Sequence, residues 1–109
     1  MSDGNRSSGV YGLLGLAAKR GAVVSGQEAC AKAIRNKVSG LMILAADSSA
    51  NTRERFINLS NENGGDYAVF GSQSELGKRI GKADRSVLIV TDLNFARGIS
   101  AILQITNRA

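Results

Sequence analysis

The sequence predicts an α/β protein that folds as a three-layer α/β/α sandwich around a four-stranded mixed sheet. Two observations lead to this prediction. Segments with helical periodicity alternate with short apolar segments of strand length along the chain. Two of the strand-like segments, 41–46 and 86–91, are apolar at nearly every position. Such strands are typical of the middle of a sheet, so helices are expected on both of its faces.

In the first half of the chain, helices are expected at 11–20 and 26–37, and strands at 22–25 and 41–46. Each helix carries apolar residues three or four positions apart, which place them on one face. The first helix is expected to stop at Gly21, because glycine commonly follows the last helical residue.

In the second half, helices are expected at 50–63, 72–82 and 92–105, and strands at 67–70 and 86–91. The helix over 50–63 is followed by two glycines, which mark its end. The last helix carries aromatic and aliphatic residues on one stripe, which is expected to face the sheet.

The length and composition favour one folded domain of a non-catalytic protein. The 109 residues suit a single domain at 10–109, after a polar, glycine-rich segment at 1–9 that is expected to be a flexible tail. The chain has no histidine, the commonest general base and metal ligand, and its one cysteine cannot form an intrachain disulfide. We therefore expect no metal, no cofactor and a cytoplasmic location. The longest apolar run is too short to span a bilayer.

The balance of charges points to a polyanionic partner. Fourteen basic residues against nine acidic residues give a net charge of +5. A basic balance of this size in a small domain favours nucleic acid first and an acidic membrane surface second. The alternative is a domain that is basic without such a partner.

The segment 25–28 has two interpretations. Its Ser-x-x-Glu pattern matches a capping box, in which the Ser25 oxygen accepts the Glu28 N–H and the Glu28 carboxylate reaches back. A helix that starts at Gly26 after a strand also presents free N–H groups, which suit a phosphate or a base edge. Lys32 and Arg35 share a face with Glu28 and can contact phosphates, or Lys32 can pair with Glu28.

A second basic cluster lies beside two glycines, Gly77 and Gly81. Its cations are Lys78, Arg79, Lys82 and Arg85. A solvated helix face is the alternative explanation. If four to six of these cations met phosphates, affinity would fall with salt at a log–log slope of roughly −3 to −5.

Other patterns do not support an enzyme. Asp47 and Asp92 each follow an apolar strand, where a carboxylate is either catalytic or a helix cap; capping is the better explanation. Cys30 lies on the apolar stripe of its helix and is expected to be a buried, unreactive side chain. Glycines recur at every third residue at Gly9, Gly12 and Gly15, but no strand precedes them. A dinucleotide-binding motif is therefore a weak interpretation of this spacing.

Three stretches in order, SGQEACAKAIRNKVSGLMILAAD, SQSELGKRIGK and VLIVTD, carry a resemblance to a known family. They resemble the ribosomal L7Ae/L30e superfamily of kink-turn RNA-binding proteins, and within it the small bacterial YlxQ-like branch. The resemblance covers about residues 13–103 and implies an α/β/α sandwich that binds RNA and is not an enzyme.

The resemblance also implies where RNA would bind. In the family, the helix that begins at the position of Gly26 reads sheared G·A pairs through a Gly-x-Asn-Glu-x-x-Lys motif. Gly26 and Lys32 match this motif, whereas Glu28 and Ala29 replace its asparagine and glutamate. The family's apolar loop before the last strand corresponds here to the charged loop 82–85.

The sequence thus predicts a monomeric, non-catalytic protein that binds structured RNA, with kink-turn RNA as one candidate, and is associated with the ribosome. Positive charge is expected to gather at one edge of the sandwich, where a turn leads into a helix. The expected RNA-binding residues are Gly26, Gln27, Glu28, Lys32, Arg35, Lys78, Lys82 and Arg85. One alternative is a protein–protein interaction module on the same fold, with RNA binding weakened or lost. Another is a small phosphoryl-handling enzyme that uses Asp47 or Asp92.

Overall fold

The computed structural model describes residues 2–104, in which five helices alternate with four strands. In chain order these are α1 (Ser2–Lys19), β1 (Val23–Ser25), α2 (Gln27–Arg35), β2 (Leu41–Leu44), α3 (Ala50–Glu62), β3 (Asp66–Val69), α4 (Gln73–Arg79), β4 (Val87–Val90) and α5 (Leu93–Leu103). Every helix and strand expected from the sequence is present within this range.

The four strands form one mixed sheet in the order β1-β4-β2-β3. β4 runs antiparallel to both of its neighbours, whereas β2 and β3 are parallel. The two continuously apolar strands, β2 and β4, therefore lie at the centre, and all four residues of each are buried. This confirms the prediction of a four-stranded mixed sheet with its most apolar strands inside.

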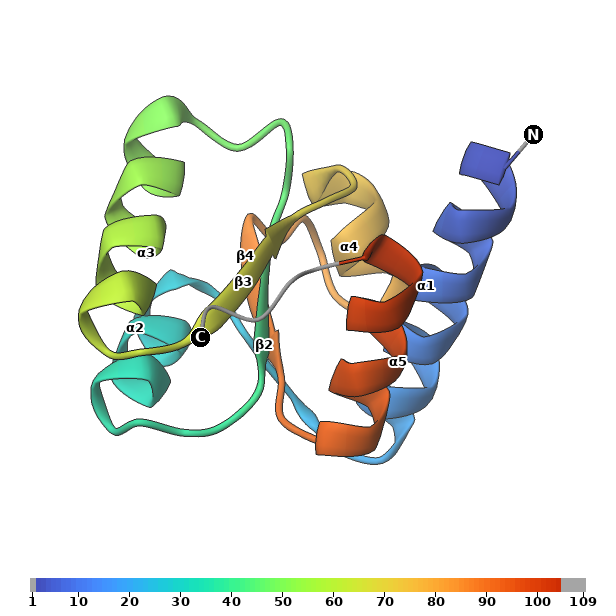
Figure 1. Ribbon diagram of the computed structural model, residues 1–109. Coiled ribbons are helices and arrows are strands. Elements are labelled where there is room, and N and C mark those ends of the chain that lie inside the picture. The colour runs from blue at the N-terminus through green and yellow to red at the C-terminus, as the bar shows by residue number, and fades with distance from the viewer. Residues whose placement is uncertain (1, 105–109) are drawn as a thin grey trace.

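Helices cover both faces of the sheet, so the molecule has three layers (Figure 1). α2 and α3 lie on one face, and α1, α4 and α5 lie on the other. Alternate residues of β2 point to opposite faces: Ile43 packs in the core under α1, α4 and α5, and Met42 packs in the core under α2 and α3. Phe56 of α3 is the largest fully buried side chain.

The first helix begins earlier than the sequence predicts. Residues 2–9 form the first two turns of α1, where a tail was expected. α1 packs along α5, and the Arg6 Nε donates a hydrogen bond to the Ile102 carbonyl oxygen at 3.3 Å. This hydrogen bond joins the segment to α5, 96 positions later in the chain. Met1 and residues 105–109 of the predicted domain lie outside the described residues.

Candidate functional site

The start of α2 is held by the backbone and not by the predicted capping box. Gly26 is the N-cap at φ 97°, and no side chain accepts a hydrogen bond there. The Gly26 N–H donates to the Val87 carbonyl oxygen at 3.1 Å. Ser25 is the last residue of β1, and its Oγ accepts a hydrogen bond from the Arg85 Nε at 3.2 Å. The prediction that Ser25 caps Glu28 is therefore wrong, because the N-cap is Gly26 and Ser25 still belongs to β1.

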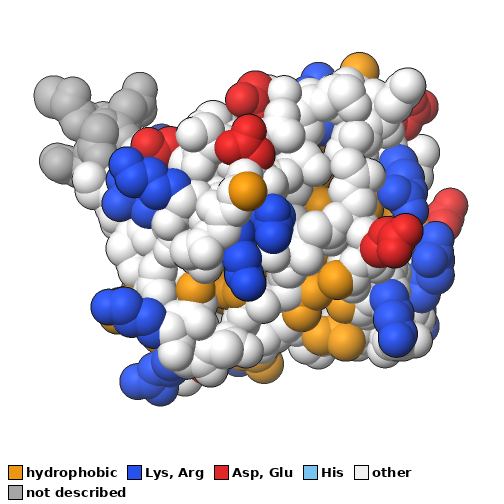
Figure 2. All heavy atoms as spheres, turned by 180° about the vertical axis from the view of Figure 1, so that it is seen from behind, with side chains coloured by type: hydrophobic (Ala, Val, Ile, Leu, Met, Phe, Trp, Pro, Cys, Tyr) orange, Lys and Arg blue, Asp and Glu red, His pale blue; other side chains and the backbone are white. Residues whose placement is uncertain are grey.

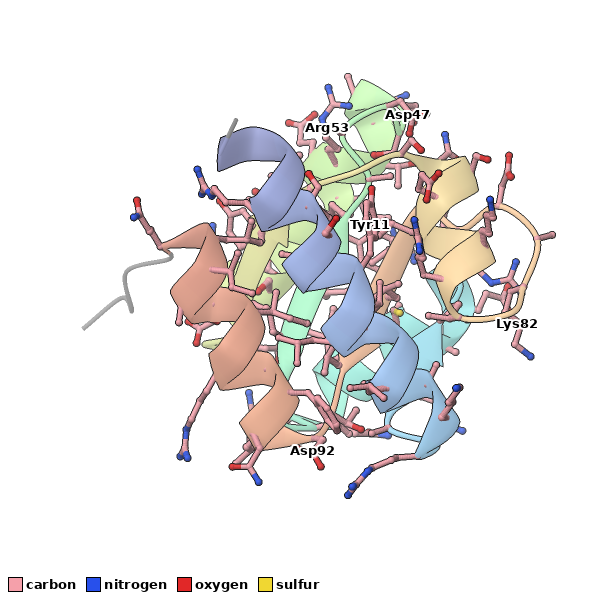
Figure 3. The ribbon with its side chains drawn as sticks, turned by 90° about the vertical axis from the view of Figure 1, so that its right-hand side faces the viewer. Tyr11, Asp47, Arg53, Lys82 and Asp92 are labelled. Carbon is pink, nitrogen blue, oxygen red and sulfur yellow. The ribbon has the colours of Figure 1, made fainter. Side chains whose placement is uncertain are left out.

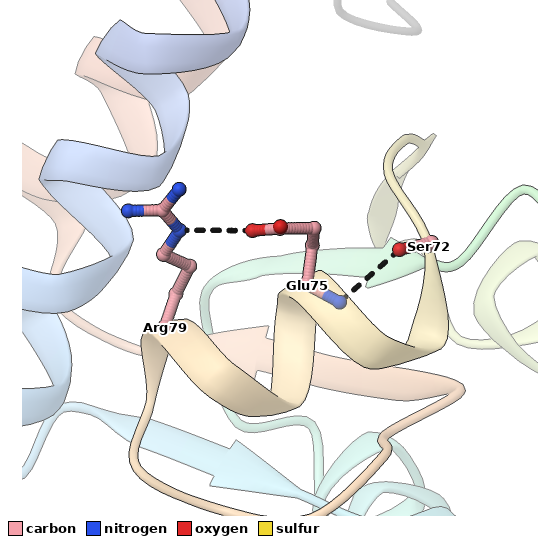
Figure 4. A network of polar contacts seen from close by, with 3 residues as sticks. All are labelled: Ser72, Glu75 and Arg79. Atoms are coloured by element: carbon pink, nitrogen blue, oxygen red, sulfur yellow. Dashed lines mark hydrogen bonds and ion pairs between the residues drawn. The ribbon is translucent and has the colours of Figure 1, made fainter.

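The serine half of a capping box forms instead at the start of α4 (Figure 4). The Ser72 Oγ accepts the Glu75 N–H at 3.1 Å. The Glu75 carboxylate does not return to Ser72 but accepts the Arg79 Nε at 3.1 Å, one helical turn later. This is an exposed i,i+4 pair, worth a few tenths of a kcal/mol.

The loop 80–86 leaves α4 through a tight glycine turn. Gly81 has φ 74°; its N–H donates to the Lys78 carbonyl oxygen at 3.1 Å, and the Lys82 N–H donates to the Gly77 carbonyl oxygen at 2.8 Å. These two bonds form a Schellman motif, which requires the left-handed conformation that glycine adopts readily. The loop then runs against Gly77, where a Cβ atom would lie only 1.9 Å from the Ala83 carbonyl oxygen.

Arg85 ties this loop to β1. Its Nε donates to Ser25, and its Nη1 donates to the Asp84 carbonyl oxygen at 3.0 Å and to the Ala83 carbonyl oxygen at 3.4 Å. The Arg85 N–H donates to the Gln73 carbonyl oxygen at 3.0 Å, at the start of α4. Arg85 is therefore only partly exposed, and it holds the loop in place.

Gln27 makes a second connection between the start of α2 and the loop. Its Nε2 donates to the Ser86 Oγ at 3.4 Å, and its Oε1 accepts the Arg55 Nη1 from α3 at 3.3 Å. Together with Arg85, these contacts join residues 25–28 and 80–86 into one surface, which we call the turn–loop surface. The structure thus brings together Gly26, Gln27 and Arg85, as the sequence predicts.

Four predicted cations remain free to meet a ligand. They are exposed, and among the described residues none has a hydrogen bond or ion pair: Lys32, Arg35, Lys78 and Lys82. The Lys82 side chain extends outward from the loop (Figure 3). Glu28 is also exposed, and the Glu28–Lys32 pair that the spacing allows is not formed within the described residues.

The cations do not gather at a single edge. On the face drawn in Figure 2, Lys and Arg side chains form separate groups at both sides and in the centre, with acidic side chains beside some of them. The expectation of one concentrated edge is therefore too simple. The turn–loop surface itself carries two of the chain's fourteen basic residues, Lys82 and Arg85.

The two aspartates that follow strands lie at opposite ends of the molecule (Figure 3). The Asp92 carboxylate caps α5, where its Oδ1 accepts the Asn94 N–H at 2.8 Å and the Phe95 N–H at 3.1 Å. The Asp47 Oδ1 accepts the Gln73 N–H at 2.9 Å, so it stabilises the start of α4 and not the helix that follows it. The capping interpretation is therefore confirmed for Asp92, whereas for Asp47 it is wrong about the helix, because Ser49 caps α3 and Asp47 binds the start of α4 instead.

Cys30 is fully buried, and its surroundings make it unreactive. Burial raises the pKa of its thiol to about 12, which keeps it protonated at neutral pH. The described residues contain no group of three side chains that could hold a metal ion. Within the same range, no helix has the length and apolar character that crossing a bilayer requires.

Comparison with known proteins identifies the family. Residues 8–99 match the model of the ribosomal protein L7Ae/L30e/S12e/Gadd45 family. The chain belongs to this family. It is 38% identical over 93 residues to the RNA-binding protein YlxQ of Bacillus subtilis (strain 168), a match that covers 85% of this chain and 93% of that protein. The RNA-binding protein YlxQ of Enterococcus faecium is 29% identical over 104 residues, which cover 95% of this chain and 99% of that protein.

Solved structures show the same fold. A protein of unknown function from Bacillus halodurans C superposes with a TM-score of 0.82 at 32% identity, covering 87% of this chain and 96% of that chain. A 15.5kD RNA binding protein from Giardia lamblia gives a TM-score of 0.77 at 18% identity, covering 92% and 86% of the two chains. The L7Ae/L30e/S12e/Gadd45 family consists of proteins that are not enzymes, which agrees with the sequence prediction.

In this member of the L7Ae/L30e/S12e/Gadd45 family, sequence reasoning missed Arg55 and Ser86. Both contact the amide of Gln27 and fix its orientation. Neither lies in a local motif. Their proximity to Gln27 arises from the packing of α3 on α2 and from the pairing of β1 with β4, so no signal near them in the sequence could have identified them.

Proposed function

We propose that this chain is a non-catalytic RNA-binding protein that holds structured RNA on the turn–loop surface and the exposed face of α2. The observation that carries this proposal is the combination of a fixed backbone platform with unpaired cations around it. The relatives named RNA-binding protein YlxQ support it, because they match nearly the whole chain.

Each part of the surface has its own role in this proposal. Lys32, Arg35, Lys78 and Lys82 contact phosphates, because their charges have no partner within the described residues. Gln27 presents an oriented amide to a base edge. Glu28 can only accept hydrogen bonds when ionised, so it would read base amino or imino groups.

Arg85 is a positioning residue in this proposal. Three acceptors within the chain already receive its N–H groups, and they fix the loop that carries Lys82. Kink-turn RNA and ribosomal RNA are the structured RNAs that we propose as ligands. Glu28 and Ala29, which differ from the family's motif, would change which base pairs are read.

Titration of variants against RNA tests the proposal. The probe is a fluorescein-labelled kink-turn RNA, with a plain duplex of equal length for comparison. The Lys32→Ala/Lys82→Ala double variant should weaken binding and make the log–log salt slope shallower by about 1.4 to 1.8. Arg85→Ala should also weaken binding, through loss of the loop position.

Arg97→Ala is the matched control, because Arg97 is exposed on α5 and lines a different cavity with Leu41 and Asp66. It should bind with wild-type affinity and slope. Wild-type affinity in the Lys32→Ala/Lys82→Ala variant would contradict the proposed surface. Pull-downs with and without nuclease address the alternative function, because protein partners that persist after nuclease would favour an interaction module.

A further inference from the structure

A groove between α1 and α4 lies next to the turn–loop surface, and of its lining residues the proposed function uses only Lys78. It has a volume of about 380 Å³. Three cations line it: Lys19 at the end of α1, and Lys78 and Arg79 at the end of α4. The carbonyl oxygen of Lys78 accepts the Gly81 N–H of the loop at 3.1 Å, so the groove adjoins the turn–loop surface.

The α1 side of the groove is smooth. Gly12 and Gly15 line it together with Leu16, whose side chain is 51% exposed. A Cβ atom at Gly12 would meet nothing within 4 Å, so packing does not require a glycine there. A glycine inside a helix is less stable than alanine. Gly12 therefore weakens α1 and leaves bare backbone that a ligand can approach closely.

The Arg79 guanidinium has a fixed orientation and free N–H groups that can bind an anion. Its Nε donates to the Glu75 carboxylate at 3.1 Å, and its guanidinium lies 4.8 Å from the centre of the Tyr11 ring. These contacts fix the plane of the guanidinium but leave both terminal nitrogens without an acceptor among the described residues. Figure 4 shows these nitrogens directed toward α1. A guanidinium held in this way can donate two parallel hydrogen bonds to a phosphate.

The remaining cations have no competing partner. Lys19 and Lys78 are exposed, and within the described part of the chain neither makes an ion pair. Gly12, Leu16 and Lys19 lie on one face of α1, because they are four and seven residues apart along the helix. Their span is about 10 Å at a rise of 1.5 Å per residue, which is the length of about two or three stacked nucleotides.

We propose that this groove binds the phosphate backbone of an RNA strand that continues from the turn–loop surface across the end of α4. Lys19, Lys78 and Arg79 would contact phosphates, and Leu16 would contact a ribose or base. Charge complementarity selects this occupant: Lys19 and Lys78 have no ion pair within the described residues, and Arg79, although paired with Glu75 through its Nε, has both terminal nitrogens free to donate. The inference rests on the proposed function, because it extends the same RNA.

The test uses the full chain and the fluorescein-labelled kink-turn RNA, lengthened by a single-stranded extension of about ten nucleotides. Lys19→Ala should make the salt slope shallower by about 0.7 to 0.9, which corresponds to about a five- to eightfold loss of affinity at 0.1 M salt. Gly12→Leu should fill the groove and also weaken binding, although the net charge does not change. Its melting temperature should be at or above the wild-type value, which separates blocked binding from loss of fold.

The controls separate failure of the groove from failure of the proposed function. Arg97→Ala removes one charge outside the groove and should leave the slope unchanged. If Lys19→Ala and Gly12→Leu bind RNA normally while Lys82→Ala binds it weakly, the proposal that the groove binds RNA is wrong and the proposed function stands. If the wild type does not bind the RNA, both are overturned. Weak binding by the groove variants beside normal binding by Lys82→Ala supports the groove and contradicts the turn–loop surface.

Discussion

Gly77→Ala is expected to displace the loop 80–86 from α4. Gly77 is buried, and a Cβ atom there would lie 1.9 Å from the Ala83 carbonyl oxygen, 2.6 Å from the Ala83 carbonyl carbon and 3.1 Å from the Asp84 Cα. All three are backbone atoms, so no side chain can rotate away. Ordinary contact begins at 3.4 Å, and the loop would therefore have to move by about 1.5 Å.

The magnitude follows from two opposing terms. Overpacking of this kind costs about 3 kcal/mol at the upper end of its usual range, because the clash is with backbone. Alanine in place of glycine returns about 1 kcal/mol of helix propensity. The net destabilisation is about 2 kcal/mol, which lowers the melting temperature of a domain of this size by about 9 °C.

Gly12→Ala is the matched control for this prediction. Gly12 is also helical, but a Cβ atom there would meet nothing within 4 Å. Only the helix-propensity term applies. The free energy of unfolding should therefore rise by about 1 kcal/mol and the melting temperature by about 4 °C. Thermal unfolding followed by circular dichroism measures both changes. A Gly77→Ala variant as stable as the wild type, or as Gly12→Ala, would refute the reasoning from close approach.

The remaining predictions concern single residues outside the loop. Lys37 has φ 57° at the end of α2, so Lys37→Gly should stabilise the protein by about 0.5–1 kcal/mol in urea unfolding, less a small loss of the exposed hydrogen bond to Asn63. Asp92→Ala removes the cap of α5 and should cost about 1–2 kcal/mol, whereas Asp92→Asn should cost less; equal losses would contradict the capping role. Burial raises the pKa of Cys30 to about 12, above that of the thiol in the unfolded chain. The free energy of unfolding should therefore fall as the pH rises from about 9 to about 12, and this fall should be weaker in Cys30→Ala. Cys30 should also react with iodoacetamide at pH 8 only after unfolding; rapid reaction in the native protein would show that the thiol is accessible.

The sheet could be predicted because its information is local. The continuous apolar runs at Leu41–Leu44 and Val87–Val90 identify the two central strands, and the helical spacing of Cys30, Ala33 and Ile34 identifies the inward face of α2. Stop signals such as Gly21 and Gly64 also lie beside the ends that they mark, whereas the expected helix 72–82 ends earlier, at Arg79, before the turn at Gly81. The family resemblance added the expected location of a binding surface.

The parts that could not be predicted depend on residues far apart in the chain. The Ser-x-x-Glu pattern occurs at both 25–28 and 72–75, and only the second forms its serine cap. The difference is that Ser72 is the N-cap of α4, whereas Ser25 is a strand residue whose hydroxyl contacts Arg85, 60 positions later, and Gly26 is the N-cap of α2. The beginning of α1 was also missed, and there too the contacts are distant: Arg6 donates a hydrogen bond to the Ile102 carbonyl oxygen of α5.

The central position of β4 affects when this surface can exist during protein synthesis. β4 is the last strand of the chain, yet it pairs with β1 and β2 and supplies the oxygen of Val87 that fixes Gly26. While residues 87–90 of a nascent chain are still inside the ribosomal exit tunnel, the Gly26 N–H at the start of α2 lacks its hydrogen bond to the Val87 carbonyl oxygen. The turn–loop surface therefore forms only after β4 has emerged, and a chain that ends before β4 does not have this surface.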